Sequence, residues 1–113
     1  MHEYTVTESL LKIVGDKAAE AGVEKVLKVR VVVGPLTGFV PDCINFYYET
    51  LSKGTIAEGA VLEFEEAPIR LRCRACAHEF SPETREWVCP SCGSAGVDIT
   101  GGRELFIKDM EVQ

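Results

Sequence analysis

Apolar residues in the first part of the chain recur at the spacing of one helical face. Counted from the first of them, they stand at offsets of 0, 4, 7, 8, 12 and 15 residues: Val6, Leu10, Ile13, Val14, Ala18 and Ala21. This spacing predicts an amphipathic helix. Gly22 is a typical helix terminator, and Glu3 and Glu8 suit the positive end of a helix dipole. The helix is therefore expected to begin within a few residues of Met1.

Residues 25–33 (KVLKVRVVV) alternate in character and are rich in β-branched side chains. One face of the alternation is apolar, formed by Leu27, Val29, Val31 and Val33. The other face carries Lys28 and Arg30. This pattern predicts a strand, and Gly34-Pro35 followed by Gly38 predicts a turn after it.

A second helix and a second strand are expected next. Pro41-Asp42 is a typical helix start, and apolar residues follow at helical spacing: Ile44, Tyr47, Tyr48 and Leu51. Gly54 closes this helix. Residues 60–65 (AVLEFE) then set two apolar residues against two glutamates, which predicts a strand with one solvated face that Pro68 ends.

The amino-acid composition changes after Pro68: four cysteines fall within residues 73–92, and aliphatic residues are scarce. Residues 104–112 (ELFIKDMEV) return to strand-like composition and are too short to stand alone, so they are expected to pair with the first sheet. The predicted fold class is α+β. A small domain of two helices and a short β-sheet, residues 1–67 plus 106–113, is interrupted by an inserted zinc-ribbon-like domain, residues 68–105.

The cysteines form two CxxC motifs separated by twelve residues, Cys73-Arg-Ala-Cys76 and Cys89-Pro-Ser-Cys92. Two such turns can supply the four thiolates, at about 2.3 Å, of a closed tetrahedral zinc site. Such a site leaves no position for a substrate water, so the zinc is expected to be structural. Gly93 suits the tight turn after the second motif. A redox-responsive dithiol and a rubredoxin-like iron site are the alternatives.

Charge and composition narrow the class of protein. The 113 residues include 12 Lys plus Arg and 18 Asp plus Glu, a formal net charge of −6. No apolar stretch approaches the ~20 residues of a membrane span, and no secretion signal is recognisable, so we expect a cytoplasmic protein with no membrane partner. In a reducing compartment, an odd count of five cysteines favours metal binding over disulfides.

The predicted zinc domain does not carry the excess of positive charge that nucleic-acid binding needs. Residues 68–105 hold five arginines and five acidic residues, and a zinc site with four thiolates adds a charge of about −2. Arg70, Arg72 and Arg74 alternate along one strand face, which a solvated edge explains as well as a phosphate contact. A zinc-ribbon adaptor that binds protein or nucleic acid stays open as an alternative function, as does a thiol redox sensor.

The remaining reactive residues do not indicate an enzyme. There is no phosphate-binding GxxxxGK[ST] motif, and no nucleophile stands with a base. His78 is expected to be an exposed residue beside the first CxxC motif, although it could replace a cysteine as a ligand. Cys43 is expected to be a small buried residue of the second helix.

The start of the sequence, Met1-His2-Glu3, has its own metal-binding chemistry. A free α-amine, the backbone nitrogen and imidazole of His2, and the amide of Glu3 can together surround one ion in a plane. Ni²⁺ and Cu²⁺ favour such square-planar nitrogen donors, whereas zinc prefers a tetrahedron. From these residues alone, an ordinary exposed histidine is the better explanation of position 2, and the chelate is the alternative.

Several short motifs stand in order along the chain: Met1-His2-Glu3, Gly34-Pro35-Leu36-Thr37, Gly54-Thr55, Glu58-Gly59-Ala60, the two CxxC motifs with Gly93, and Gly102-Arg103-Glu104-Leu105. Together they resemble the HypA/HybF family of nickel metallochaperones. The resemblance covers essentially the whole chain. Thr37 and Tyr4 stand where the family commonly has a serine and an aliphatic residue, and neither is an expected ligand.

The resemblance implies a non-enzymatic carrier with two metals. Exchangeable Ni²⁺ would be held at Met1, His2 and Glu3, and structural Zn²⁺ at Cys73, Cys76, Cys89 and Cys92. It also implies delivery of nickel to the large subunit of [NiFe]-hydrogenase, together with a GTPase of the same maturation pathway. Members of the family also serve urease maturation in some organisms.

Overall fold

The computed structural model describes the backbone of residues 2–113 and the side chains from Glu3 onward. The chain divides into two compact units. The helical unit comprises Met1–Val32, Phe39–Glu65 and Phe106–Gln113, and the cysteine unit comprises Val33–Gly38 and Glu66–Leu105. No helix in the described part of the chain has the length and apolar character needed to cross a membrane.

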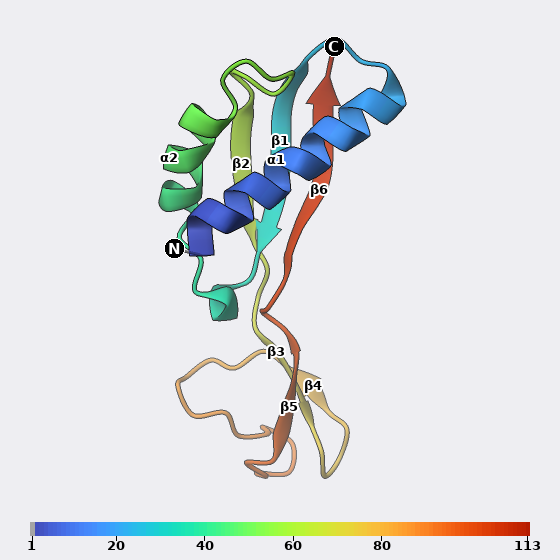
Figure 1. Ribbon diagram of the computed structural model, residues 1–113. Helices are drawn as coiled ribbons and strands as arrows, with labels where there is room; N and C mark the ends of the chain where they lie inside the picture. Colours follow the sequence, from blue (N-terminus) through green and yellow to red (C-terminus); the bar gives the residue numbers. More distant parts are fainter. Residues whose placement is uncertain (1) are drawn as a thin grey trace. The chain divides into compact units, whose positions relative to one another are not determined.

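The helical unit consists of two helices and a three-stranded sheet. The helices are α1 (His2–Ala21) and α2 (Pro41–Leu51), and the strands are β1 (Val26–Val33), β2 (Val61–Glu66) and β6 (Leu105–Val112). The strand order is β2-β1-β6, so the last strand returns to the sheet begun by the first. Figure 1 shows α1 lying across this sheet and β6 running opposite to β1. The predicted α+β class and the pairing of the C-terminal strand with the first sheet are confirmed.

The core of the helical unit forms where the apolar stripe of α1 meets the sheet. Leu10, Val14 and Ala18 are buried, as the periodicity predicts, and Thr7 joins them with no exposed surface. The Thr7 hydroxyl donates a hydrogen bond to the carbonyl of Glu3 at 2.5 Å, which satisfies a polar group that burial would otherwise penalise. Ile13 is 45% exposed, because it lies about 100° around the helix from the centre of the buried stripe.

The charged face of the sheet confirms the predicted position of Lys28 and Arg30 on one side of β1. Arg30 contacts Asp109 at 2.6 Å and Glu111 at 2.9 Å, both on β6, and Glu63 on β2 at 3.4 Å. Lys28 adds a contact to Glu63 at 3.2 Å. One row of cations in the central strand thus faces carboxylates on both neighbours, which are favourable cross-strand pairs.

The start of β1 differs from the simple alternation. Val26 is fully buried whereas Leu27 is 42% exposed, although Leu27 was predicted on the apolar face with Val29 and Val31. The amide of Val26 donates to the carbonyl of Ile56 at 3.1 Å. Val26, which is hydrogen-bonded to the turn before β2, therefore enters the core, and Leu27 does not.

The cysteine unit contains a small antiparallel sheet in the order β4-β3-β5. Its strands are β3 (Arg70–Cys73), β4 (Glu79–Phe80) and β5 (Val97–Gly101). Leu71 in the central strand is opposite Phe80 and Ile99. The buried cluster has only four members, Leu71, Cys73, Phe80 and Cys89. A core this small cannot by itself fold a unit of about 40 residues.

The segment Val33–Gly38, which includes the short 3-10 helix η1 (Pro35–Thr37), belongs with the cysteine unit. The amide of Gly34 donates to the carbonyl of Glu104, and that of Leu36 to the carbonyl of Gly102, both at 2.8 Å. A Cβ on Gly34 would stand 2.1 Å from the Gly102 carbonyl oxygen. The two backbones can approach this closely only because Gly34 has no side chain. The predicted domain ranges, which assign residues 33–38 to the first domain, differ from this division.

Gly34→Ala is expected to lower the free energy of unfolding by about 1–3 kcal/mol, the worth of the two hydrogen bonds that the new methyl group would displace. Gly15→Ala is the matched control, because Gly15 lies inside α1 with open space around its Cβ position. That change should instead raise stability by roughly 0.5–1 kcal/mol. Urea denaturation of both variants measures the two effects. Equal responses would contradict the close approach at Gly34.

Candidate metal centre

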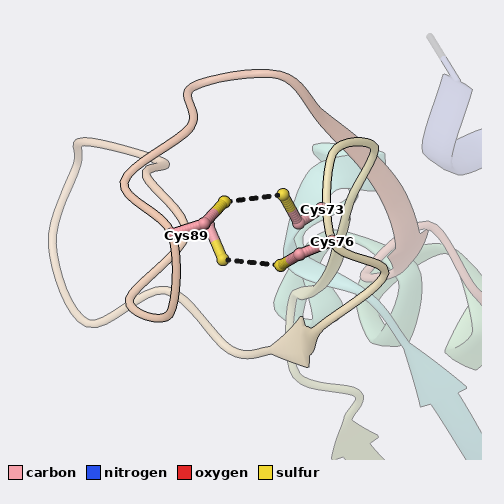
Figure 2. Close-up of side chains that lie close together, drawn as sticks. Cys73, Cys76 and Cys89 are labelled. Atoms are coloured by element: carbon pink, nitrogen blue, oxygen red, sulfur yellow. Dashed lines mark hydrogen bonds between the residues drawn. The ribbon is translucent and has the colours of Figure 1, made fainter.

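The first CxxC motif forms a tight turn that begins at the end of β3. The amide of Ala77 donates to the carbonyl of Cys73 at 2.9 Å, and the amide of Cys73 donates to the carbonyl of His78 at 2.9 Å. These two bonds close the backbone around the first cysteine. The side chains of Cys73 and Cys76 are left on the same side of the turn, where Figure 2 shows them together.

The second CxxC motif repeats the same hydrogen bonds. The amide of Gly93 donates to the carbonyl of Cys89 at 2.8 Å, and the amide of Cys89 donates to the carbonyl of Ser94 at 2.9 Å. Gly93 has a φ of 78°, and Ala77, at the same place in the first motif, has a φ of 65°. Ala77 is the one non-glycine residue with positive φ among the described residues. The motif spacing predicted the glycine, and comparing the two motifs position by position would have indicated the strained alanine.

The two turns bring four sulfur atoms to one point. Cys73 Sγ lies 3.5 Å from Cys92 Sγ, and Cys76 Sγ lies 3.6 Å from Cys89 Sγ. All four sulfurs are within 4.8 Å of one another. In a tetrahedron with Zn–S distances of about 2.3 Å, the sulfurs are about 3.8 Å apart, so the four residues fit a zinc ion. The predicted cluster of Cys73, Cys76, Cys89 and Cys92 is thus brought together.

The electrostatics of the cluster also favour a cation. The backbone amide of Cys76 donates to the Cys73 sulfur and lowers the pKa of this thiol to about 6. The Ser94 amide lowers the pKa of Cys92 in the same way. Hydrogen bonding to Cys73, desolvation and the two other cysteines raise it by more, so that this pKa is about 12. Four adjacent thiols therefore cannot all ionise on their own. A bound metal ion removes this conflict, because its charge stabilises every thiolate at once.

The cluster has a protected side and a solvent side. Cys73 and Cys89 are 1% exposed and belong to the small apolar core, whereas Cys76 and Cys92 are exposed. Ile69, Trp87, Val97 and Ile99 pack around the buried pair. A metal held here would connect both turns to the core of the cysteine unit.

The arginines of β3, Arg70 and Arg72, and Arg74 just after it have polar or acidic neighbours. Arg74 contacts Asp98 at 3.3 Å, and Arg72 is opposite both Glu79 and Asp98 in the sheet register. Arg70 donates to the Ser81 hydroxyl at 3.0 Å. Arg74 is thus paired with a carboxylate and Arg72 has acidic register partners, so these side chains do not form an uncompensated positive surface for phosphate.

His78 and Cys43 are both exposed. The His78 ring stacks on Phe80 with centroids 6.0 Å apart, and the prediction of an exposed residue beside the first motif is confirmed. The prediction for Cys43 was wrong. Helix α2 buries Ile44 and Tyr48, and Cys43, one residue before Ile44, is rotated by about 100° away from that buried stripe.

Two of the three predicted nickel ligands, His2 and Glu3, lie at the start of α1. Met1 is outside the described residues. His2 begins the helix, and Glu3 is half-buried in its first turn. The structure describes no side chain for His2, so the ligand set Met1, His2 and Glu3 stays a prediction.

These features define a class: a small two-unit protein in which an α/β unit is joined to a zinc-ribbon-like unit built around four cysteines. Residues 1–112 match the family model described as "Hydrogenase/urease nickel incorporation, metallochaperone, hypA". The chain belongs to this HypA family.

Named relatives and solved structures agree with this assignment. A hydrogenase maturation factor HypA of Dehalococcoides mccartyi strain CBDB1 is 42% identical over 112 residues, covering 99% of this chain and 94% of the relative. That of Moorella thermoacetica is 39% identical and covers 95% of both chains. The solution structure of the nickel metallochaperone HypA from Helicobacter pylori matches with a TM-score of 0.72 at 27% identity, covering 97% of this chain and 96% of that one. A solution structure of HypA protein matches with a TM-score of 0.80 at 28% identity, covering 100% and 97%.

Ala77→Gly is expected to raise the free energy of unfolding by about 0.5–1 kcal/mol. It removes a left-handed backbone penalty of about 1–2 kcal/mol and adds a smaller entropy cost in the unfolded chain. Ala75→Gly in the same turn is the control and should destabilise, because Ala75 has no positive φ to relieve. Guanidinium unfolding with zinc in excess measures both. A destabilised Ala77→Gly variant would show that the turn is not strained.

Proposed function

We propose that this protein is a nickel metallochaperone that binds Ni²⁺ at Met1, His2 and Glu3 and delivers it during [NiFe]-hydrogenase maturation. The observation that carries the proposal is the whole-chain match to a nickel-incorporation family, in a chain that has a histidine at position 2. His2 and Glu3 lie in the first turn of α1. Their adjacent nitrogen atoms, with the amine of Met1, form the planar donor set that Ni²⁺ favours.

The proposed carrier works with partners and in a defined compartment. A hydrogenase-maturation GTPase assists it, and the large subunit of [NiFe]-hydrogenase receives the nickel, in the cytoplasm. Urease maturation is a second destination consistent with the family description. The protein itself is an accessory factor and catalyses no reaction.

In the same proposal, the four-cysteine cluster holds a structural Zn²⁺. Its support is the sulfur geometry together with the small apolar core around it. Zinc supplies the charge that keeps the four thiolates together. The chain supplies the two turns, and the backbone amides that donate to Cys73 help to keep that sulfur in its ionised form.

His2→Ala is expected to abolish stoichiometric Ni²⁺ binding, because it removes the imidazole from the chelate, while zinc content and circular dichroism stay unchanged. Isothermal titration with NiCl₂, with zinc assayed in parallel, measures this. His78→Ala is the matched control: His78 is the only other histidine, and its replacement should leave nickel affinity unaltered. Wild-type nickel affinity in His2→Ala would refute the proposed site.

Removal of zinc is expected to unfold the cysteine unit and leave the helical unit folded. Trp87 is the one tryptophan of the chain and packs against the cluster, so a strong chelator should shift its fluorescence to longer wavelength as water reaches it. Amide NMR signals from α1 and β1 should persist. Native Trp87 emission after complete loss of zinc would show that the unit folds without metal.

A further inference from the structure

A patch of exposed aromatic and aliphatic side chains lies where the first turns of α1 meet α2. Phe46 is 67% exposed, Val40 47% and Tyr4 42%. The Tyr4 and Tyr47 rings meet edge to face at 5.3 Å, and Phe46 contacts Tyr47 in the same way at 5.4 Å. Figure 1 shows the N-terminal end of α1 beside α2. Val40, Tyr4, Phe46 and Tyr47 are called the aromatic patch below.

Single exposed apolar residues are common on protein surfaces, but here aromatic side chains adjoin one another. Both helices bury other residues for their own packing: α1 uses Leu10 and Val14, and α2 uses Ile44 and Tyr48. The aromatic patch is therefore additional to the core. Adjoining exposed apolar residues with acidic neighbours are typical of a surface that docks another molecule.

The charged side chains nearest to the aromatic patch along α1 and α2 are acidic, and Lys12 and Lys53 follow one turn further on. Exposed acids adjoin it at helical spacing: Glu8 lies four residues after Tyr4, and Glu49 lies three residues after Phe46. Neither residues 1–11 nor residues 39–52 contain any lysine or arginine. The helical unit as a whole has seven basic and twelve acidic residues, a net charge of −5.

The acidic residues beside the aromatic patch, Glu8 and Glu49, form its rim. Their charge excludes some of the molecules that could bind there. A second copy of the chain would bring acids against acids, and like charges across an interface are costly. An anionic lipid surface or a nucleic acid would be repelled in the same way, since both attract clusters of lysine and arginine. A protein surface with an apolar centre and a basic rim is complementary in both respects.

We propose that the aromatic patch is the docking surface for a partner protein that presents apolar side chains ringed by lysine and arginine. The inference rests on the proposed function, because the patch shares the first turns of α1 with the proposed nickel residues. A partner bound there would meet the cargo at its point of transfer. Phe46, the most exposed aromatic side chain, is expected to be the main anchor.

The test is a titration of purified hydrogenase-maturation GTPase, and separately of the hydrogenase large subunit, into the full-length protein. Phe46→Ser should weaken binding of at least one of them by about ten-fold or more. Phe106→Ser is the matched control, because Phe106 is an exposed aromatic residue of the same unit (48%) on β6, outside the patch; its affinity should change less than about two-fold. Both variants should bind nickel like the wild type.

A charge variant tests the rim separately. Glu49→Lys should weaken the same complex and reduce the dependence of its association rate on salt, while Glu83→Lys, an exposed acid of the cysteine unit, should change neither. Cys43 adds a direct probe, since it is exposed on α2 and lies three residues from both Val40 and Phe46. Partner binding should slow its alkylation by a maleimide.

Three results would overturn the proposal. The first is wild-type partner affinity in Phe46→Ser, or no binding of either partner to the wild type. The second is a concentration-dependent dimer that Phe46→Ser abolishes in sedimentation, which would make a second copy the occupant. The third is binding to phosphatidylglycerol vesicles that the same change abolishes. Nickel titration of the same samples tests the carrier function independently. Failure of the docking proposal can therefore be distinguished from failure of the proposed nickel site.

Discussion

Four sulfur atoms within 4.8 Å of one another are the constraint on which the cysteine unit depends. Two chain segments supply them, each through a turn with the same pair of backbone hydrogen bonds. Thiols so close cannot all ionise without a cation, as the raised pKa of Cys92 shows. The buried members, Cys73 and Cys89, are also half of the buried cluster of this unit. In the proposed zinc site, metal binding and formation of this core would therefore be one event.

The helical unit is stabilised in a different way. Its buried residues are mainly aliphatic and come from α1, α2 and β1, and its charged residues form a network on the sheet around Arg30. Exposed ion pairs contribute little individually, so apolar burial is the main stabilising term. This difference explains why loss of metal is expected to affect only one unit. Because its charged residues lie outside the apolar core, the helical unit can carry most of the negative charge of the chain without destabilising that core.

The features that the sequence predicts well are those with strong local patterns. Alternation located β1 and β2, helical spacing located α1 and α2, and the two CxxC motifs located all four cysteines of the cluster. The return of β6 to the first sheet also followed from its length and composition. Each of these depends on periodicity, spacing or composition, which can be read from the sequence without knowledge of the tertiary structure.

The features that were missed depend on contacts between distant segments. Cys43 was expected inside because cysteine is small and apolar, but the orientation of α2 is set by Ile44 and Tyr48. Gly34 lies within a recognisable turn motif, yet its close approach to Gly102 joins residues 68 positions apart. The exposure of Phe46, by contrast, agrees with the predicted apolar stripe of α2, which leaves Phe46 out.

The proposed assignment of two metals to two kinds of site follows from ligand chemistry. For a given donor set, divalent ions compete closely, so geometry and ligand type decide which ion is retained. A tetrahedron of four thiolates suits zinc, and with two of its sulfurs buried it closes around the ion. A cargo ion needs the opposite: donors that protons can displace and a position at the end of an element, which the nitrogen atoms of the first turn of α1 provide. If zinc fills the thiolate site as proposed, the strongest competing ligands in the chain are removed, and nickel would be left to the proposed N-terminal site, from which it can be passed on.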